Sequence, residues 1–586
     1  MINRKIYKEN YFLGIIAILF GLLFVALFKI QVIDGRTYSE IAEKNYFRVA
    51  KKPARRGIIY DRNLQPLVEN IPSFAVYLDM TKLQDRVELA AFLSQNLPLT
   101  KDEILDIIYK NRFRKFAPVL LDEDVELATA IKLEENHNKF PEIIVQAESR
   151  RHYLDNSHFL GYVGKISQDE YESLKNQGYD RMDYIGKVGL EGYYENSLKG
   201  EEGYDVVQVD ALGNNLGLAK GDLSRNPRPG KDLVLTVDIE LQHELERLLP
   251  ADSACAGIVM DCRTGGILAA VSTPPYNPNK FVSGMESTYW NELLTDRHKP
   301  LLIKYSQATY PPGSTFKLAV SSYILEKKLV DPDEVLVDCK GGIEYGGKFF
   351  GCWKKHGKVN LLDAIRESCN SYFFTIGKTI NLNDFSSFID SCELTSKTGI
   401  DLAGGERGGF FPTSSWYDEN YGRFGWTRGH LLNLMIGQGE VLVTPLALTR
   451  FYAAIANDGA LVQPHFADYF IVDGSQERLS FPPSYIPIKP ETCAFLRHAL
   501  DAAVNDPGRT GGLARIEGVR VGGKTGTAET YQGDTHAWFA AIAPIDNPEI
   551  VVVVFIENGG SGADTPALIT GQILAHYFGT NPILAY

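Results

Sequence analysis

The chain has 586 residues, too many for one ordinary hydrophobic core, so at least two folded domains are expected. Apolar residues make up 44% and charged residues 23%, as in ordinary folded proteins. The formal net charge of −13 comes without the clustered Lys and Arg that phosphate contacts require, so we expect no nucleic-acid partner.

An uncharged apolar run at residues 11–28 is about long enough to cross a bilayer. Arg4, Lys5 and Lys8 precede it, so the positive-inside rule places the N-terminus in the cytoplasm and the bulk of the chain in the periplasm or extracytoplasmic space. A cleaved signal peptide is the alternative, but residues 29–32 are not a small-residue cleavage site. We expect a cytoplasmic tail at 1–10 and a single-pass anchor in the cytoplasmic (inner) membrane at 11–31.

Residues 32–230 read as an accessory domain. A strand-like run at 55–63 ends in turn residues, and the pattern from 81 to about 140 is helical and acidic. Proline, arginine and asparagine concentrate at 225–230, which indicates a surface loop. We therefore place the main domain boundary after residue 230.

Residues 231–586 alternate between strand and helix patterns. Strands are predicted at 233–237, 256–260 and 265–271, and again at 519–527, 536–543 and 550–557. A helix is predicted at 566–578. Strands at both ends with helices between them indicate an α+β domain whose sheet is closed by the C-terminal segment.

A possible nucleophile lies at the start of a buried helix, where Ser314 follows a Pro-Pro-Gly turn and Lys317 comes three residues later. A hydroxyl is a poor nucleophile at neutral pH, and an amine one turn away could take its proton if burial keeps that amine neutral. The Ser-x-x-Lys spacing alone also occurs by chance in many helices.

Two further patterns follow in order. Ser368-Cys369-Asn370 ends a helical run, and Lys524-Thr525-Gly526-Thr527 lies on the first of the three C-terminal strands. A second Lys-Thr-Gly at 397–399 has no apolar partner strands around it, so we interpret it as a loop. The ordered trio resembles the penicillin-recognising acyl-serine enzymes.

The resemblance extends over nearly the whole chain. The span, the runs at 56–63 and 189–191, and those at 437–439 and 444–445 look like class B penicillin-binding proteins. The runs at 310–314, 353–355 and 398–402 are more similar to the elongation-type enzyme, penicillin-binding protein 2, than to the division type. The resemblance implies an elongated pedestal (dimerisation-type) domain and a penicillin-binding transpeptidase domain with a central antiparallel sheet flanked by helices. Cys369, and threonine at 525 where some relatives have serine, depart from the pattern without removing a required group.

The family's reaction is acyl transfer from D-Ala-D-Ala stem peptides of peptidoglycan, with β-lactams as acylating inhibitors. By resemblance, Ser314 attacks, Lys317 accepts its proton, Ser368 passes a proton toward the leaving amine, and Asn370 binds the substrate amide.

The strand supplies the rest of the implied site. Lys524 adds positive potential and Thr525 binds the terminal carboxylate, while backbone N–H groups of Ser314 and Thr527 form the oxyanion site. Gly526, with Gly523, permits close backbone approach to the ligand.

A second group of residues has the donor set of a structural zinc site: Cys339, Cys352, His356 and Cys369. Elongation-type relatives carry zinc in this region, some with a carboxylate in the first position, so Asp338 is an alternate ligand to Cys339. One disulfide plus a free thiol is the other interpretation. Zinc would hold the loop of Ser368 and Asn370 as structural support; we expect no organic cofactor.

Four other functions remain in view: a division-type transpeptidase, a β-lactamase, a β-lactam sensor and an inactive scaffold. The long pedestal and the second motif disfavour a β-lactamase, the tail of about ten residues disfavours a sensor, and the intact motifs disfavour a scaffold. Elongation-type relatives work with a membrane glycan polymerase and other elongation-complex proteins, which are the expected partners.

Overall fold

The structure is a computed structural model that describes residues 2–36, 47–113, 118–209, 215–219, 224–282, 284–423, 425–506, 509–530 and 533–583. The chain forms two compact units. The first comprises Met1–Arg56, Pro72–Glu148 and Lys199–Gly230, and the second Gly57–Ile71, Ser149–Leu198 and Lys231–Tyr586. The single boundary after residue 230 stays a prediction, and residues 1 and 37–46 of the predicted tail and pedestal lie outside the described residues.

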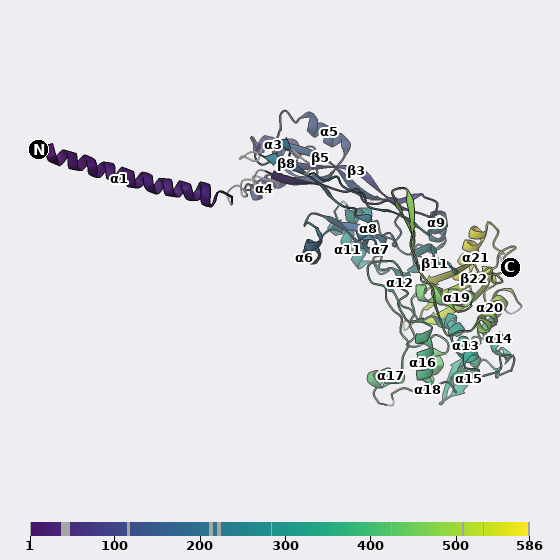
Figure 1. Cartoon of the computed structure of the whole chain (residues 1–586). Helices are drawn as coiled ribbons and strands as arrows, with labels where there is room; N and C mark the ends of the chain where they lie inside the picture. Colours follow the sequence, from purple (N-terminus) through teal and green to yellow (C-terminus); the bar gives the residue numbers. More distant parts are fainter. Residues whose placement is uncertain are drawn as a thin grey trace. The chain divides into compact units, whose positions relative to one another are not determined.

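The N-terminal helix α1 (Ile2–Phe28), purple in Figure 1, continues into a π-helical turn at Lys29–Ile33. Within the described ranges it is the one helix long and apolar enough to cross a membrane, over Tyr11–Ile33, and none of that stretch is buried. An apolar helix with no protein packed on it fits the predicted single-pass anchor.

The first unit also holds a three-stranded antiparallel sheet and a small α+β core. The sheet has the order β1-β8-β9, with β1 (Phe47–Lys52), β8 (Gly203–Val209) and β9 (Asn215–Leu218). The core packs α3 (Arg86–Leu93), α4 (Lys101–Lys110) and α5 (Leu127–Glu135) around β4 (Val119–Val125). A capping box of Thr100 and Glu103 fixes the start of α4. The helical reading of residues 81–140 was wrong at β4, where acidic residues hid an alternating strand.

Two long strands, β3 (Pro66–Leu78) and β5 (Ile143–Tyr153), pass from one unit of the chain to the other. In the second unit, β10 (Asp232–Leu235) pairs in parallel with β2 (Ile59–Tyr60) and antiparallel with β18 (Ala467–Val472), which pairs with β19 (Ser475–Arg478). Arg151 and Glu191 form a buried ion pair there, with a 2.6 Å Nε to Oε1 distance. Elements nearby are β6 (Tyr162–Lys165), β7 (Tyr184–Val188), α6 (Gln168–Leu174), α7 (Gly189–Tyr193) and α8 (Glu195–Leu198).

The second unit is built on a five-stranded antiparallel sheet of order β12-β11-β23-β22-β21. Its strands are β11 (Cys255–Asp261), β12 (Ile267–Ser272), β21 (Gly522–Glu529), β22 (Thr535–Ala543) and β23 (Ile550–Ile556). The first two and the last three come from opposite ends of the domain, so the predicted closure of the sheet by the C-terminal segment is confirmed. β21 is an edge strand in this order.

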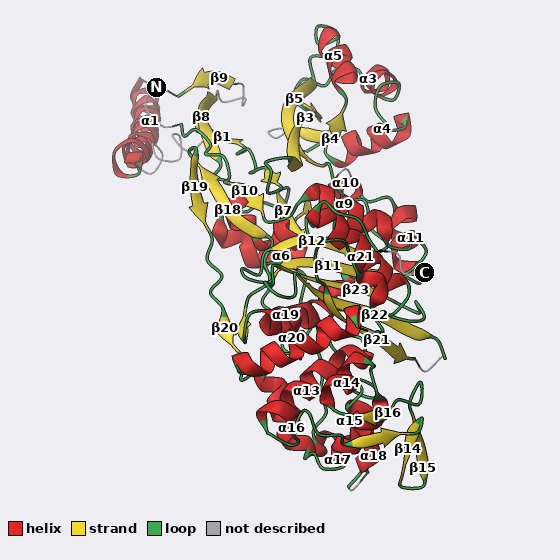
Figure 2. Cartoon of the chain, turned by 90° about the vertical axis from the view of Figure 1, so that its right-hand side faces the viewer, coloured by secondary structure: helices red, strands yellow, loops and turns green. Residues whose placement is uncertain are grey.

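Both faces of this sheet are buried, because consecutive residues of its strands are apolar and their side chains point to opposite faces. Val552 and Val554 face a core shared with α9 (Ile239–Leu248) and α21 (Thr565–Phe578). Val551 and Val553 face the larger core, which includes α13 (Lys317–Glu326) and α19 (Pro445–Ala456). Figure 2 shows the strands between these two sets of helices. The predicted α+β architecture with a helix-flanked antiparallel sheet is confirmed.

The remaining helices and short strand pairs complete the second unit. The helices are α10 (Asn279–Val282), α11 (Ser287–Thr295), α12 (Lys304–Gln307), α14 (Leu361–Arg366), α15 (Asn370–Gly377), α16 (Leu382–Ser391), α17 (Ser414–Tyr421), α18 (Arg428–Leu434) and α20 (Pro490–Asn505). Among them, α14, α16 and α20 contact α13. Three small antiparallel pairs join β13 (Val337–Cys339) to β16 (Gly357–Val359), β14 (Gly342–Tyr345) to β15 (Lys348–Gly351), and β17 (Ala460–Leu461) to β20 (Ser484–Tyr485).

Candidate active site

Ser314 lies in a 3₁₀ turn at Gly313–Phe316 that leads into α13. The turn packs against strand β21: a Cβ on Gly313 would lie 2.6 Å from the Thr527 carbonyl oxygen, and the φ of Gly313 is +54°. Only glycine fits both the left-handed backbone and this close approach. The turn is also held by a 2.9 Å hydrogen bond from Gly313 N–H to the Gly437 carbonyl. Ser314 is thereby placed beside Thr527, at the mouth of a cleft.

Lys317 is fully buried beneath that turn. Its Nζ donates to the Ser368 carbonyl at 2.9 Å, to Ser368 Oγ at 3.1 Å and to Asn370 Oδ1 at 2.6 Å. Burial lowers the pKa of Lys317 to about 8. Within the described part of the chain Lys317 makes no hydrogen bond to Ser314. The second motif therefore orients the amine. The spacing of three residues places the amine on the same helical face as the serine.

Ser368 occupies the turn between α14 and α15 and has a left-handed backbone, with φ of +55°. A non-glycine residue in this region is strained by roughly 1–3 kcal/mol, and such strain concentrates at functional sites. Asn370 begins α15, whereas the sequence placed it at the end of a helical run. The Asn370 amide nitrogen donates to the Gly351 carbonyl at 3.3 Å, so strand β15 orients it.

Strand β21 presents the third motif in two directions. Lys524 is fully buried and its pKa is strongly lowered, first by burial and then by the nearby Lys317. Thr525 and Thr527 line the cleft. A Cβ on Gly526 would lie 2.9 Å from the Pro312 carbonyl, and one on Gly523 would lie 2.8 Å from the Phe539 ring. Both glycines therefore accommodate packing within the protein, in addition to any role toward a ligand.

The cleft has a volume of about 1310 Å³ and opens onto all three motifs, through Ser314, Ser368, Asn370, Thr525 and Thr527. Its other walls come from segments outside the three motifs. They include Phe349 in the β14–β15 hairpin, Gln438, whose amide donates to the Thr527 carbonyl at 3.1 Å, and the loop residues Arg509 and Thr510. Gln438 belongs to a Gly-Gln-Gly run visible in the sequence; the hairpin and the loop carried no comparable signal.

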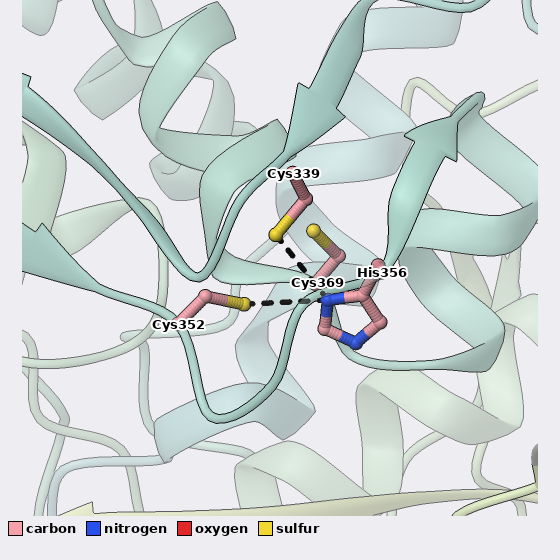
Figure 3. A group of neighbouring side chains, drawn as sticks. All are labelled: Cys339, Cys352, His356 and Cys369. Carbon is pink, nitrogen blue, oxygen red and sulfur yellow. Dashed lines mark hydrogen bonds between the residues drawn. The ribbon is translucent and has the colours of Figure 1, made fainter.

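Three cysteines and a histidine converge at one point, as Figure 3 shows, and one of them, Cys369, follows Ser368 in the chain. The ligand atoms of Cys339, Cys352, His356 and Cys369 all lie within 4.8 Å of one another. His356 Nδ1 is 3.5 Å from Sγ of both Cys339 and Cys352, close to the spacing of about 3.5 Å between S and N ligands of a tetrahedral zinc ion. All seven cysteines are free thiols in the structure.

The alternate ligand Asp338 lies apart from this group. Its side chain is 59% exposed and 4.0 Å from Lys340. The neighbouring Cys339 is the residue that turns inward, so the cluster is a three-thiol, one-imidazole set. Cys352 also accepts a 3.2 Å hydrogen bond from the Asn370 backbone N–H, which connects the cluster to the second motif.

The second Lys-Thr-Gly, at 397–399, lies in a loop. Glu406 accepts hydrogen bonds from Thr398 N–H at 2.6 Å, Thr398 Oγ1 at 2.7 Å and Gly399 N–H at 2.9 Å. The donors of this copy are thus occupied by the chain itself, and it does not line the cleft. The interpretation as a loop without strand partners is confirmed.

This fold and cleft define the class of penicillin-recognising acyl-serine enzymes. The family model "Penicillin binding protein transpeptidase domain" matches residues 255–575, and "Penicillin-binding Protein dimerisation domain" matches residues 51–235. Peptidoglycan D,D-transpeptidase MrdA of Escherichia coli (strain K12) is 32% identical over 96% of this chain and 93% of that protein. MrdA of Haemophilus influenzae is 30% identical over 97% of this chain and 90% of that protein.

Solved structures agree. Penicillin-binding protein 2 from Helicobacter pylori in complex with MreC has a TM-score of 0.80 at 28% identity, covering 91% of this chain and 99% of that chain. Penicillin-binding protein 2 from Pseudomonas aeruginosa in complex with WCK 5153 has a TM-score of 0.69 at 26% identity, covering 90% of this chain and 96% of that chain. The chain belongs to the penicillin-binding proteins, as a peptidoglycan D,D-transpeptidase most like the elongation-type penicillin-binding protein 2. The resemblance seen in the sequence is confirmed, over the division-type alternative.

Proposed function

We propose that the chain cross-links peptidoglycan stem peptides through an acyl-Ser314 intermediate. Ser314 Oγ attacks the carbonyl between the two D-alanines and gives its proton to Lys317. The C–N bond breaks, and the leaving D-alanine amine takes a proton through Ser368. In the second half, an acceptor amine attacks the ester carbon, loses a proton, and the C–Oγ bond breaks with the proton returning to Ser314.

A single observation carries these roles: Lys317 Nζ lies within hydrogen-bonding distance of Ser368 Oγ and Asn370 Oδ1, while Ser314 opens onto the same cleft. Lys317 is thereby placed to exchange a proton with Ser368 Oγ, and in the proposed reaction the same amine, one helical turn from Ser314, takes the Ser314 proton when the substrate is bound. Gly313, the residue before Ser314, abuts β21 at Thr527, with its Cβ position 3.1 Å from Thr527 N, which supports the use of the Ser314 and Thr527 backbone N–H groups as the oxyanion site.

Acylation by a labelled penicillin tests the nucleophile. We expect stable labelling of the full chain and none of Ser314→Ala. Ser321→Ala is the matched control, because Ser321 Oγ is buried on α13 without a hydrogen-bond partner within the described residues. Labelling of Ser314→Ala would refute the assignment, and rapid release of the label would favour a β-lactamase.

We also propose a structural zinc ion held by Cys339, Cys352, His356 and Cys369. The donor types and the 3.5 Å spacings fit such an ion. Bound zinc would supply no step of the reaction; it would fix the turn carrying Ser368 and Asn370, through Cys369 and the bond from Asn370 N–H to Cys352.

Metal content of the purified chain tests this second proposal. We expect about one zinc per chain, lost in His356→Ala and kept in Cys493→Ala, which removes a buried cysteine outside the cluster. A metal-free preparation with full penicillin labelling would contradict the proposal.

For the cellular setting, we propose that residues 1–10 lie in the cytoplasm, the helix crosses the inner membrane and the remaining chain lies outside the cytoplasm. We further propose that it works with a membrane glycan polymerase and other elongation-complex proteins; the similar Helicobacter pylori protein was solved with MreC.

Two experiments test this setting. A phosphatase reporter that is active only outside the cytoplasm, fused after residue 230, should be active. Depletion should give round cells, whereas filaments would indicate a division role.

A further inference from the structure

The three motifs present no basic side chain to the cleft for the carboxylate that the substrate carries. Lys524 is expected to attract the terminal carboxylate of D-Ala-D-Ala, but its side chain is fully buried and does not line the cleft. Its Nζ donates to the Thr525 carbonyl at 3.2 Å. Burial and Lys317 both favour its neutral form. Thr525 offers a hydroxyl to the carboxylate, and no charge.

Two basic side chains line the cleft in the described part of the chain: Lys348 and Arg509. Lys348 begins strand β15, whose Gly351 carbonyl binds the Asn370 amide on the wall opposite β21. Arg509 is exposed in the loop after α20, and its side chain makes no hydrogen bond or ion pair within the described residues. Gly512 accommodates that side chain, since a Cβ there would lie 2.4 Å from Arg509 Nε.

The Arg509 loop lies beside the beginning of the third motif. A Cβ on Gly511 would lie 3.0 Å from the Phe539 ring, and one on Gly523, immediately before Lys524, would meet the same ring at 2.8 Å. Thr510, between them, also lines the cleft and donates to the Arg366 carbonyl at 3.3 Å. The loop that carries Arg509 is therefore packed at the end of β21 where the third motif begins, and Arg509 and Thr525 line the same cleft.

We propose that Arg509 is a specificity-determining residue that binds the carboxylate next to the reacting nitrogen, first on the leaving D-alanine and then on the acceptor. This inference rests on the proposed transpeptidation. The leaving nitrogen belongs to an amino acid, with a carboxylate on the same carbon. The acceptor nitrogen must reach the ester carbon from the position that the leaving nitrogen vacated, because the second half-reaction is the reverse of the first.

The consequence is a preference for one chemical class of acceptor: amines with a carboxylate on the same carbon, in the D configuration of the leaving residue. A guanidinium offers two parallel N–H donors to a carboxylate, and an amide in its place would receive no charge-assisted bond. The acyl-enzyme and the bond changes are unaltered: the acceptor nitrogen forms the new C–N bond and loses a proton, and Ser314 Oγ regains one.

The test compares acceptors on the full chain in detergent, with a thioester donor that lacks the terminal carboxylate. We expect aminolysis by D-alanine to exceed that by D-alaninamide. Arg509→Gln should lower the D-alanine rate by on the order of tenfold, the scale of one lost charge-assisted bond, while the D-alaninamide rate stays unchanged. Arg509→Lys should keep part of the preference. Lys348→Gln, the other cleft cation, is the matched control and should keep it all.

Equal loss with both acceptors, or an unchanged preference in Arg509→Gln, would overturn the proposal. So would loss of the preference in Lys348→Gln alone. Acyl-enzyme formation from the same thioester is measured in every variant. Its absence in the unaltered chain would count against transpeptidation itself, so the two failures are distinguishable.

Discussion

Acylation should rise with pH through the titration of Lys317. The amine must be neutral to take the proton of Ser314, and burial lowers its pKa to about 8. The neutral fraction is then about one tenth at pH 7, one half at pH 8 and nine tenths at pH 9. The second-order rate of penicillin acylation should therefore rise about tenfold from pH 7 to pH 9 and level off, whereas an unshifted lysine would still be almost fully protonated at pH 9.

Stopped-flow or quenched labelling over pH 6 to 10 measures this profile, and unfolding is followed at each pH. The folded-state pKa of Lys317 lies below its ordinary value of 10.5, so between about pH 8 and 10.5 the unfolded chain binds more protons. The lysine therefore contributes stability that increases as pH rises through this window. A change in the folded fraction caused by this group would not explain the levelling of the acylation rate above pH 8.

A second lysine provides the matched control. Lys304 is also buried, and burial lowers its pKa to about 8, but its Nζ donates to the Lys299 carbonyl and it does not line the cleft. Lys304→Met should leave the shape of the profile unchanged, and Lys317→Met should abolish acylation while the chain stays folded. A flat profile from pH 7 to pH 9, or acylation by Lys317→Met, would refute the assignment of Lys317 as the base.

Three further outcomes follow from the structure. Gly313→Ala should lose penicillin labelling, because its Cβ would meet the Thr527 carbonyl, whereas Gly474→Ala, also at positive φ but with open space around it, should cost only about 1–2 kcal/mol of backbone strain in thermal unfolding. Arg151→Met should lower the free energy of unfolding by about 3–5 kcal/mol, since Glu191 stays buried without this partner. The double variant Arg151→Met with Glu191→Leu should recover most of that free energy. An equal loss in the single and the double variant would refute the ion-pair account. Ser368→Gly should fold normally, because glycine adopts φ of +55° freely, but slow transfer to acceptor amines; an unchanged rate would remove Ser368 from the proton path.

Much of the sheet was predictable because all of its strands except β21 are largely apolar runs between turn residues, as in Ile550–Ile556. Strand β4 was missed because its alternation is carried by leucines between acidic residues that also suit a helix surface. The order of the three motifs predicted which segments converge. It did not predict that Lys317 is bonded to Ser368 and Asn370, because that depends on a left-handed turn at Ser368 that no spacing reveals.

The two Lys-Thr-Gly segments show that the structural context of a motif decides its function more than its three-residue sequence does. At 524–526 the segment lies on an edge strand, with an apolar partner strand on one side and the Ser314 turn packed against Gly526. That register buries the lysine and leaves Thr525 and Thr527 in the cleft. At 397–399 no strand fixes the backbone, so its N–H groups fold around Glu406. The apolar residues that distinguish the two segments can be recognised in the sequence. The position of Arg509 in the cleft cannot, because it depends on how the loop after α20 packs on Phe539. The residue that we propose selects the acceptor is thus outside every motif, on one of the two cleft walls that carried no sequence signal; the other is the β14–β15 hairpin.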